Sequence, residues 1–188
     1  RWHARAASMI GKVGIIGAGS MGTALAQSIS RRAGEVTIYG RRQEVVDSIN
    51  HDRSNTNYFP GLLLNPNIHA RLIGDGVDIQ DCEVVIIAVP SSEVRSVIHT
   101  IRDNVRGAIL VTVSKGLEYP SLKTMSEIIS EETGNPEIAS FSGPNFADEI
   151  AYGHIAGATV GTGSPSVRAA ISELFEEFTL DFSDDVRA

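Results

Sequence analysis

The chain has 188 residues, of which 16 are Lys or Arg and 23 are Asp or Glu, so its formal net charge is −7. This acidic balance argues against a general nucleic-acid binder or a protein that binds anionic membranes, although it is compatible with a local basic site for a phosphorylated ligand. A bilayer span needs about 20 apolar residues, whereas the longest clean apolar run covers only residues 84–89. We therefore expect no membrane span and no nucleic-acid partner.

The single cysteine, Cys82, cannot form an intrachain disulfide, and this usage is typical of a reducing compartment. We therefore expect a cytoplasmic protein in which Cys82 is a small buried side chain. Residues 1–8 lack the apolar core of a secretory signal. They are predicted to be a cloning remnant or a short extension, and residues 9–188 to form one domain.

Short apolar runs rich in β-branched residues alternate with helical patterns along the chain, which is typical of βαβ units and a mostly parallel sheet. The predicted strands cover residues 12–16, 36–39, 68–72, 84–89, 108–113, 138–141, 156–161 and 179–182. The predicted helices cover residues 21–32, 43–53, 93–105, 122–132, 146–152 and 165–178. The sequence thus predicts an α/β fold with a doubly wound sheet of the Rossmann type.

A glycine-rich turn follows the first predicted strand and opens a helix. Its glycines are Gly17, Gly19 and Gly22, spaced as G-x-G-x-x-G. In this context Gly17 permits the tight turn, Gly19 leaves room for a pyrophosphate, and Gly22 lets the helix pack closely on the strand. The helix N-terminus supplies N–H donors to the anion. The spacing therefore predicts a dinucleotide site, with a plain glycine-rich turn as the alternative.

The second predicted strand has no carboxylate at its end, where NAD-binding proteins usually place one for the ribose 2′-OH. It is followed instead by Arg41 and Arg42, whose planar guanidinium groups suit a 2′-phosphate. We therefore expect a cofactor of the NADP or NAD type, with NADP favoured. The alternative is that both arginines are solvated loop charges.

Ligands in open α/β sheets lie beyond the carboxyl ends of the strands. Pro90 follows the fourth predicted strand, Lys115 the fifth, and Gly143 and Asn145 the sixth. Lys115 is predicted to hold a substrate phosphate or hydroxyl, or to donate a proton, unless it is a plain surface lysine. Asn145 lies near a helix N-terminus that offers donors to an oxygen ligand, unless it is an ordinary cap.

Four segments in chain order resemble NAD(P)-dependent sn-glycerol-3-phosphate dehydrogenases. They are Gly-Ala-Gly-Ser-Met-Gly-Thr-Ala-Leu at 17–25, Asn-Tyr-Phe-Pro-Gly at 57–61, Ser-Lys-Gly-Leu-Glu at 114–118 and Ser-Gly-Pro-Asn-Phe-Ala-Asp-Glu-Ile-Ala at 142–151. The resemblance covers residues 9–187 and implies the N-terminal, cofactor-binding domain. It also implies hydride transfer between NAD(P)H and C2 of dihydroxyacetone phosphate or sn-glycerol 3-phosphate, which feeds glycerophospholipid synthesis.

Carried over by residue, the resemblance implies roles for a set of side chains and backbone positions. Lys115 is placed at the junction of cofactor and substrate, as the catalytic residue predicted in this chain. The family's helical second domain, with its main catalytic lysine, has no counterpart here. The family also implies a phosphorylated small-molecule substrate and a homodimer of the full-length protein. The implied cofactor contacts are Ser20, Met21, Arg41 and Ala147, and the implied substrate contacts are Gly143 and Asn145. Pro90 is predicted as a further cofactor contact from its place at the end of the fourth strand.

Two alternatives stay open at this point. A ketopantoate or pyrroline-carboxylate reductase shares the glycine-rich turn and a helical partner domain, but does not account for the segments at 57–61 and 142–147 together. A nucleotide-binding module without chemistry is the other alternative. The five histidines do not fall at metal-ligand spacing, so no metal is predicted.

Overall fold

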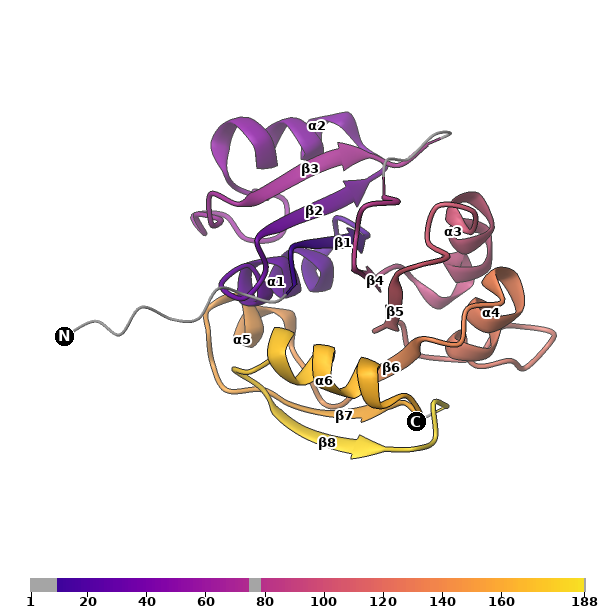
Figure 1. The fold of residues 1–188 in the computed structure, drawn as a ribbon. Helices are drawn as coiled ribbons and strands as arrows, with labels where there is room; N and C mark the ends of the chain where they lie inside the picture. Colours follow the sequence, from indigo (N-terminus) through magenta and orange to yellow (C-terminus); the bar gives the residue numbers. More distant parts are fainter. Residues whose placement is uncertain (1–9, 75–78, 188) are drawn as a thin grey trace.

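The computed structural model describes residues 10–74 and 79–187 of the chain and shows one eight-stranded sheet (Figure 1). Residues 1–9, including the predicted extension, lie outside the described residues. The strand order is β3-β2-β1-β4-β5-β6-β7-β8. The strands are β1 (Lys12–Ile16), β2 (Glu35–Gly40), β3 (Ile68–Leu72), β4 (Val84–Ile87), β5 (Ile109–Thr112), β6 (Ile138–Ser142), β7 (Gly157–Gly161) and β8 (Thr179–Ser183).

Strands β1 to β6 are parallel to their neighbours, β7 runs antiparallel to β6, and β8 is parallel to β7. The predicted Rossmann-type, mostly parallel sheet is thus confirmed. Because the first six strands point the same way, their carboxyl ends meet at one edge of the sheet. This edge carries the loops that the sequence assigns to ligand binding.

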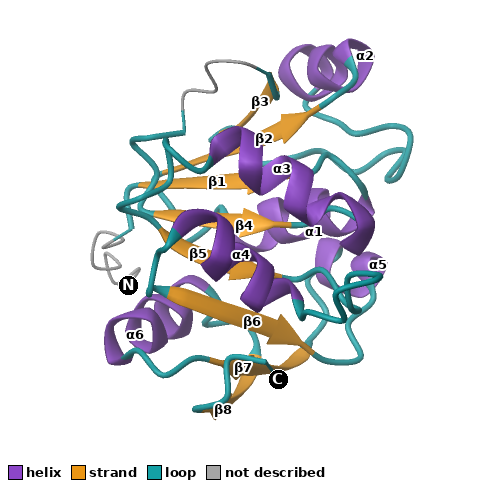
Figure 2. Ribbon diagram, turned by 90° about the vertical axis from the view of Figure 1, so that its right-hand side faces the viewer, coloured by secondary structure: helices purple, strands orange, loops and turns teal. Residues whose placement is uncertain are grey.

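Helices cover both faces of the sheet (Figure 2). Helices α3 and α4 lie over one face, and α1 lies on the other. Within the described ranges, no helix has the length and apolar content that crossing a bilayer requires. The helices are α1 (Ser20–Ile29), α2 (Gln43–Asp47), α3 (Val94–Ile101), α4 (Met125–Thr133), α5 (Ala147–Ala151) and α6 (Pro165–Leu174).

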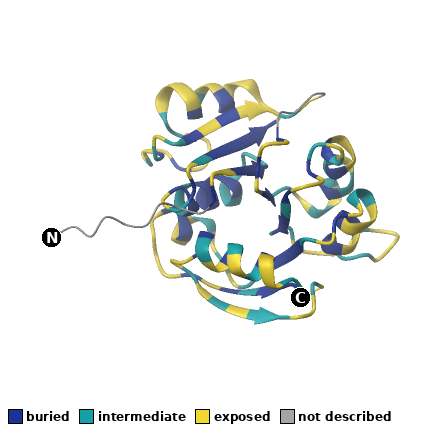
Figure 3. Cartoon of the chain, viewed as in Figure 1, coloured by how far each residue is buried: buried dark blue, intermediate teal, exposed yellow. Residues whose placement is uncertain are grey.

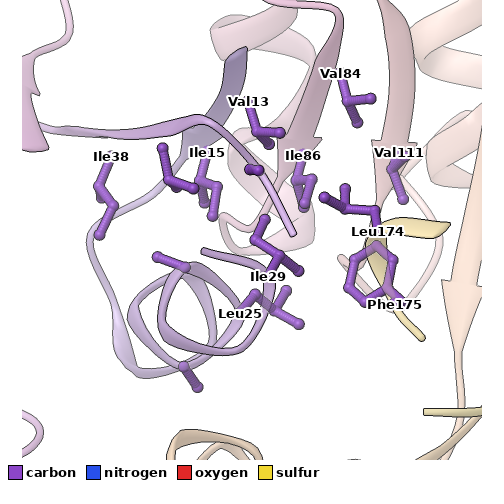
Figure 4. Packing of buried hydrophobic residues seen from close by; sticks show 14 of the residues in the cluster. Val13, Ile15, Leu25, Ile29, Ile38, Val84, Ile86, Val111, Leu174 and Phe175 are labelled. Carbon is purple, nitrogen blue, oxygen red and sulfur yellow. The ribbon is translucent and has the colours of Figure 1, made fainter. Parts of the chain in front are cut away.

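The core is divided by the sheet into two apolar clusters, and strand β4 contributes to both. Val84 and Ile86 pack with residues of α1 and α6 (Figure 4), while Val85 and Ile87 pack with residues of α3 and α4. A strand covered on both faces needs consecutive apolar residues rather than alternating ones. The burial pattern of the central strands shows this double cover (Figure 3).

Several predicted helices have different boundaries in the structure. The helix predicted from residue 122 begins at Met125, because Leu122 has a positive φ of 57° and Thr124 and Glu127 form a capping box. The helix predicted to reach residue 178 ends at Leu174. The helix predicted over 43–53 is α-helical only to Asp47 and continues as a π-helical turn to residue 52. Cys82 is 9% exposed, as its predicted burial requires.

Candidate functional site

The glycine-rich turn connects β1 to α1, and its three glycines have different reasons to lack a side chain. Gly17 has a φ of 119°, and a Cβ there would lie 2.3 Å from the carbonyl oxygen of Ala88. A Cβ on Gly22 would lie 2.0 Å from the carbonyl oxygen of Gly17. A Cβ on Gly19 would meet nothing within 4 Å. Gly17 and Gly22 are therefore required by the fold, whereas Gly19 borders open space.

Helix α1 presents its N-terminus at this open position. Gly19 is the N-cap residue, and no side chain caps the helix. The first intrahelical bond runs from Thr23 N–H to the carbonyl of Gly19, so the N–H groups that precede it have no partner within the helix. A helix N-terminus with open N–H donors and no Cβ in front of it favours an anion.

Asn55 supports the turn from a loop position that no sequence motif indicates. Its side chain is 1% exposed, and its Nδ2 donates to Ala18 O at 3.1 Å and to Thr23 Oγ1 at 2.8 Å. A buried polar side chain usually needs such partners. The sequence signal that could have indicated Asn55 is its position just before the segment at 57–61. That segment is anchored in the core by Phe59, which is 2% exposed.

A cleft of about 360 Å³ lies at the carboxyl ends of β1, β2 and β4. The predicted cofactor contacts that do not line this cleft are Met21, Gly22, Lys115 and Ala147. Met21 is partly buried against the core. Tyr58 from the segment at 57–61 lines it as well. The predicted residues that line it are Gly17, Gly19, Ser20, Arg41, Arg42 and Pro90.

Arg41 is paired with a carboxylate from the opposite wall of the cleft. Its two terminal nitrogens lie 3.0 Å from the two carboxylate oxygens of Glu93, which also lines the cleft. Arg42 lies 3.7 Å from Glu44. Both arginines line the cleft and both have acidic neighbours, which the local sequence pattern does not indicate.

Lys115 and Gly143 are brought together at the ends of β5 and β6. The Lys115 Nζ donates to the carbonyl oxygen of Gly143 at 2.5 Å. Gly143 has a φ of 144°, and a Cβ there would lie 2.8 Å from Gly157 O, so only glycine fits. Lys115 lines a second cavity of about 320 Å³ and not the first one. Gly143 and Asn145 line neither of these two cavities, so the structure does not gather the predicted cofactor and substrate contacts in one cavity.

Asn145 does not cap helix α5. The N-cap residue is Phe146, and no side chain caps this helix. Asn145 N–H donates to Gly143 O at 2.9 Å, whereas its side-chain Oδ1 is buried and has no hydrogen-bond partner among the described residues. An unpaired buried carbonyl is destabilising, so a purely structural role does not explain this conformation. Ala147, the first residue of α5, packs partly against the core.

An ion-pair cluster holds the segment that follows Lys115. The guanidinium group of Arg95 on α3 binds both carboxylate oxygens of Glu118, at 2.6 and 2.9 Å, and also contacts Glu131 and Glu132 on α4. The bonds from Arg95, and then one from Ser121, lower the pKa of Glu118 to about 2. The cluster fixes the backbone after Lys115 to two helices.

Loss of this cluster should make stability less sensitive to acid. The pKa of Glu118 falls from 4.5 to about 2 on folding, so its contribution to the free energy of unfolding is present above about pH 5 and is lost as the pH falls toward 2. The stability difference between the natural chain and Arg95→Met should therefore shrink steadily between pH 5 and pH 2.5. Urea unfolding at several pH values measures it.

The matched control is Arg106→Met, which removes an exposed arginine that pairs with Asp103 at 2.7 Å on the surface. Surface pairs of this kind contribute little, so this variant should follow the natural chain at each pH. An Arg95→Met difference that stays constant from pH 5 to 2.5 would show that Glu118 does not titrate with the cluster.

Comparisons with known proteins identify the family to which the chain belongs. Residues 12–167 match the family model described as NAD-dependent glycerol-3-phosphate dehydrogenase N-terminus. The chain is 43% identical over 175 residues to the glycerol-3-phosphate dehydrogenase [NAD(P)+] of Methanothermobacter thermautotrophicus, which covers 93% of the chain and 54% of the relative. It is 37% identical over 163 residues to the enzyme of that name from Caulobacter vibrioides, covering 86% of the chain and 49% of the relative.

The fold comparison agrees with the sequence comparison. The glycerol-3-phosphate dehydrogenase structure from Plasmodium falciparum superposes with a TM-score of 0.83 at 25% identity, covering 94% of this chain and 53% of that one. The chain thus spans about half the length of the relatives it matches. These matches favour the resemblance over the ketopantoate and pyrroline-carboxylate reductase alternatives. The chain belongs to the NAD-dependent glycerol-3-phosphate dehydrogenase family and corresponds to its N-terminal part.

Proposed function

We propose that the chain binds NADPH or NADH in the cleft at the ends of β1, β2 and β4, and that NADPH is preferred. The observation that supports this most directly is the open position at Gly19, in front of the uncapped N-terminus of α1. A pyrophosphate placed there receives N–H donors without meeting a Cβ. The adenosine end then extends over the end of β2, where Arg41 lines the cleft. The names of the relatives, which include NAD(P)+, support the same cofactor class.

We further propose that the enzyme to which this chain belongs interconverts dihydroxyacetone phosphate and sn-glycerol 3-phosphate. The nicotinamide would supply the hydride. Lys115, whose ammonium group is held by the Gly143 carbonyl, would bind the oxygen at C2 and donate a proton to it as it becomes an alkoxide. Gly143 and Asn145 would form the wall behind the substrate, because the Gly143 carbonyl accepts from both the Lys115 ammonium group and the Asn145 N–H. The main support is the pairing of Lys115 with Gly143 at the sheet edge next to the cleft.

The cofactor preference is tested by titrating NADPH and NADH against the chain and against Arg41→Ala, with nucleotide fluorescence as the signal. A charge-assisted contact contributes roughly 1.5–3 kcal/mol, so Arg41→Ala should weaken NADPH binding about ten- to a hundredfold and change NADH binding little. Arg106→Ala, which removes the same charge from the exposed pair with Asp103, serves as the control. Equal weakening of both cofactors, or tighter NADH binding by the unchanged chain, would contradict the preference.

Two further proposals concern the location and the assembly of the full-length protein. We propose a cytoplasmic location, supported by the single cysteine among 188 residues. We also propose that the full-length protein is a homodimer, supported by the family resemblance. Light scattering during size-exclusion chromatography of the full-length protein measures the second directly.

A further inference from the structure

The ion pair between Arg41 and Glu93 crosses the cleft proposed for the cofactor. Arg41 is the first residue after β2, whereas Glu93 ends a short 3-10 turn that begins one residue after Pro90, beyond β4. The two oxygens of Glu93 each lie 3.0 Å from a different terminal nitrogen of Arg41. The carboxylate therefore uses the two-pronged face of the guanidinium group, which is the face that a phosphate also uses.

The charge at the 2′ position of each cofactor determines how the Arg41–Glu93 pair affects its binding. A phosphate monoester carries nearly two negative charges at neutral pH, so a 2′-phosphate that binds Arg41 must displace the Glu93 carboxylate or lie beside it. Both outcomes disfavour the phosphorylated cofactor. A ribose 2′-OH is neutral and donates a hydrogen bond, so a nearby carboxylate is a suitable partner for it. The side chain of Glu93 is 29% exposed and that of Arg41 69% exposed, so the pair is within reach of a ligand in the cleft.

We infer that Glu93 is a specificity-determining residue: from the wall opposite β2 it supplies the carboxylate that the end of β2 lacks, and it reduces the preference for NADPH over NADH. Arg41 and Glu93 then set the ratio of NADPH to NADH affinity together. The arginine favours the 2′-phosphate, and the glutamate competes for that arginine. This inference rests on the proposed function, because it requires the adenosine ribose to lie beside Arg41.

The test is Glu93→Gln, which keeps the size of the side chain and removes its charge. Its matched control is Glu44→Gln, because Glu44 lies 3.7 Å from Arg42, is 67% exposed and does not line the cleft. NADPH and NADH are titrated against each variant at one fixed, low ionic strength, since salt screens exposed charges. Circular dichroism verifies that both variants remain folded.

Glu93→Gln should tighten NADPH binding about three- to tenfold, which combines the loss of an exposed ion pair with the removal of a like charge beside the phosphate. NADH binding should stay unchanged or weaken, so the NADPH to NADH affinity ratio rises. Glu44→Gln should leave this ratio within about twofold of the unchanged chain. In the Arg41→Ala background, the gain in NADPH affinity from Glu93→Gln should fall to less than half, because no guanidinium group remains to be released.

An affinity ratio for Glu93→Gln that equals the ratio for Glu44→Gln would overturn the inference. So would an equal shift for both cofactors, because Glu93 would then only shape the cleft. Failure of the unchanged chain to bind either cofactor is a separate result that contradicts the proposed function itself. An unchanged chain that binds both cofactors, with a ratio insensitive to Glu93, leaves the proposed function standing and removes this inference alone.

Discussion

Gly19→Val should abolish binding of both NADPH and NADH while leaving the fold intact. The backbone at Gly19 is extended, with a φ of −85° and a ψ of −172°, a conformation that valine adopts readily. A Cβ there meets nothing within 4 Å in the protein, so the valine side chain should clash with the bound pyrophosphate and not with the protein. Affinity should drop at least about a hundredfold, equivalent to roughly 2.7 kcal/mol. Fluorescence titration measures the affinity, and thermal unfolding verifies the fold.

Gly22→Val is the informative contrast, since the two glycines belong to the same turn. A Cβ on Gly22 would lie 2.0 Å from the backbone oxygen of Gly17, so this variant should lose stability before any ligand is added. Binding and folding are thereby separated within three residues of sequence. Normal NADPH affinity in a folded Gly19→Val protein would show that the pyrophosphate does not lie in front of α1.

Lys115→Met should lower the kcat/KM for dihydroxyacetone phosphate by about a hundredfold or more, because general acid catalysis by a positioned side chain typically contributes 10²–10⁴-fold. Affinity for NADPH should fall only modestly, since Lys115 does not line the cleft at β1, β2 and β4. The measurement needs both halves of the enzyme. A chimera of this chain with the C-terminal half of the Methanothermobacter thermautotrophicus relative provides them.

Lys123→Met is the matched control for that experiment. Lys123 lies in the same connection between β5 and α4, but its ammonium group pairs with Glu131 at 2.7 Å on the surface. It should leave kcat/KM within about threefold. An active chimera that tolerates Lys115→Met as well as Lys123→Met would remove Lys115 from the proposed chemistry.

The sheet was predictable from the sequence because its signal is local. Consecutive apolar residues over 84–87 indicate a strand covered on both faces, and this strand does contribute to both clusters of the core. The ends of the helices were harder to predict, because hydrophobic periodicity carries no information about capping hydrogen bonds. The capping box of Thr124 and Glu127 decides where α4 begins, although Leu122 continues the apolar pattern.

The site was predictable only as far as its residues are fixed by backbone geometry. The spacing of the glycines at the turn is by itself enough to predict their role in a dinucleotide site. The pairing of Arg41 with Glu93 joins positions 52 residues apart, and no local pattern indicates it. The support that Asn55 gives to Ala18 and Thr23 is equally nonlocal. Long-range polar contacts depend on the finished fold, so they were missed.

The attachment of the glycine-rich turn has a consequence for amide hydrogen exchange. Gly17 N–H donates to the Tyr39 carbonyl at 2.9 Å and Ala88 N–H to the Ile16 carbonyl at 2.8 Å, so the base of the turn belongs to the central sheet and exchanges only when that sheet opens. The amides of Ser20 and Met21 precede the first bond of α1 and exchange quickly without a ligand. Slow and fast amides thus lie within four residues of each other, and an anion bound at Gly19 would slow the fast ones without altering the slow ones.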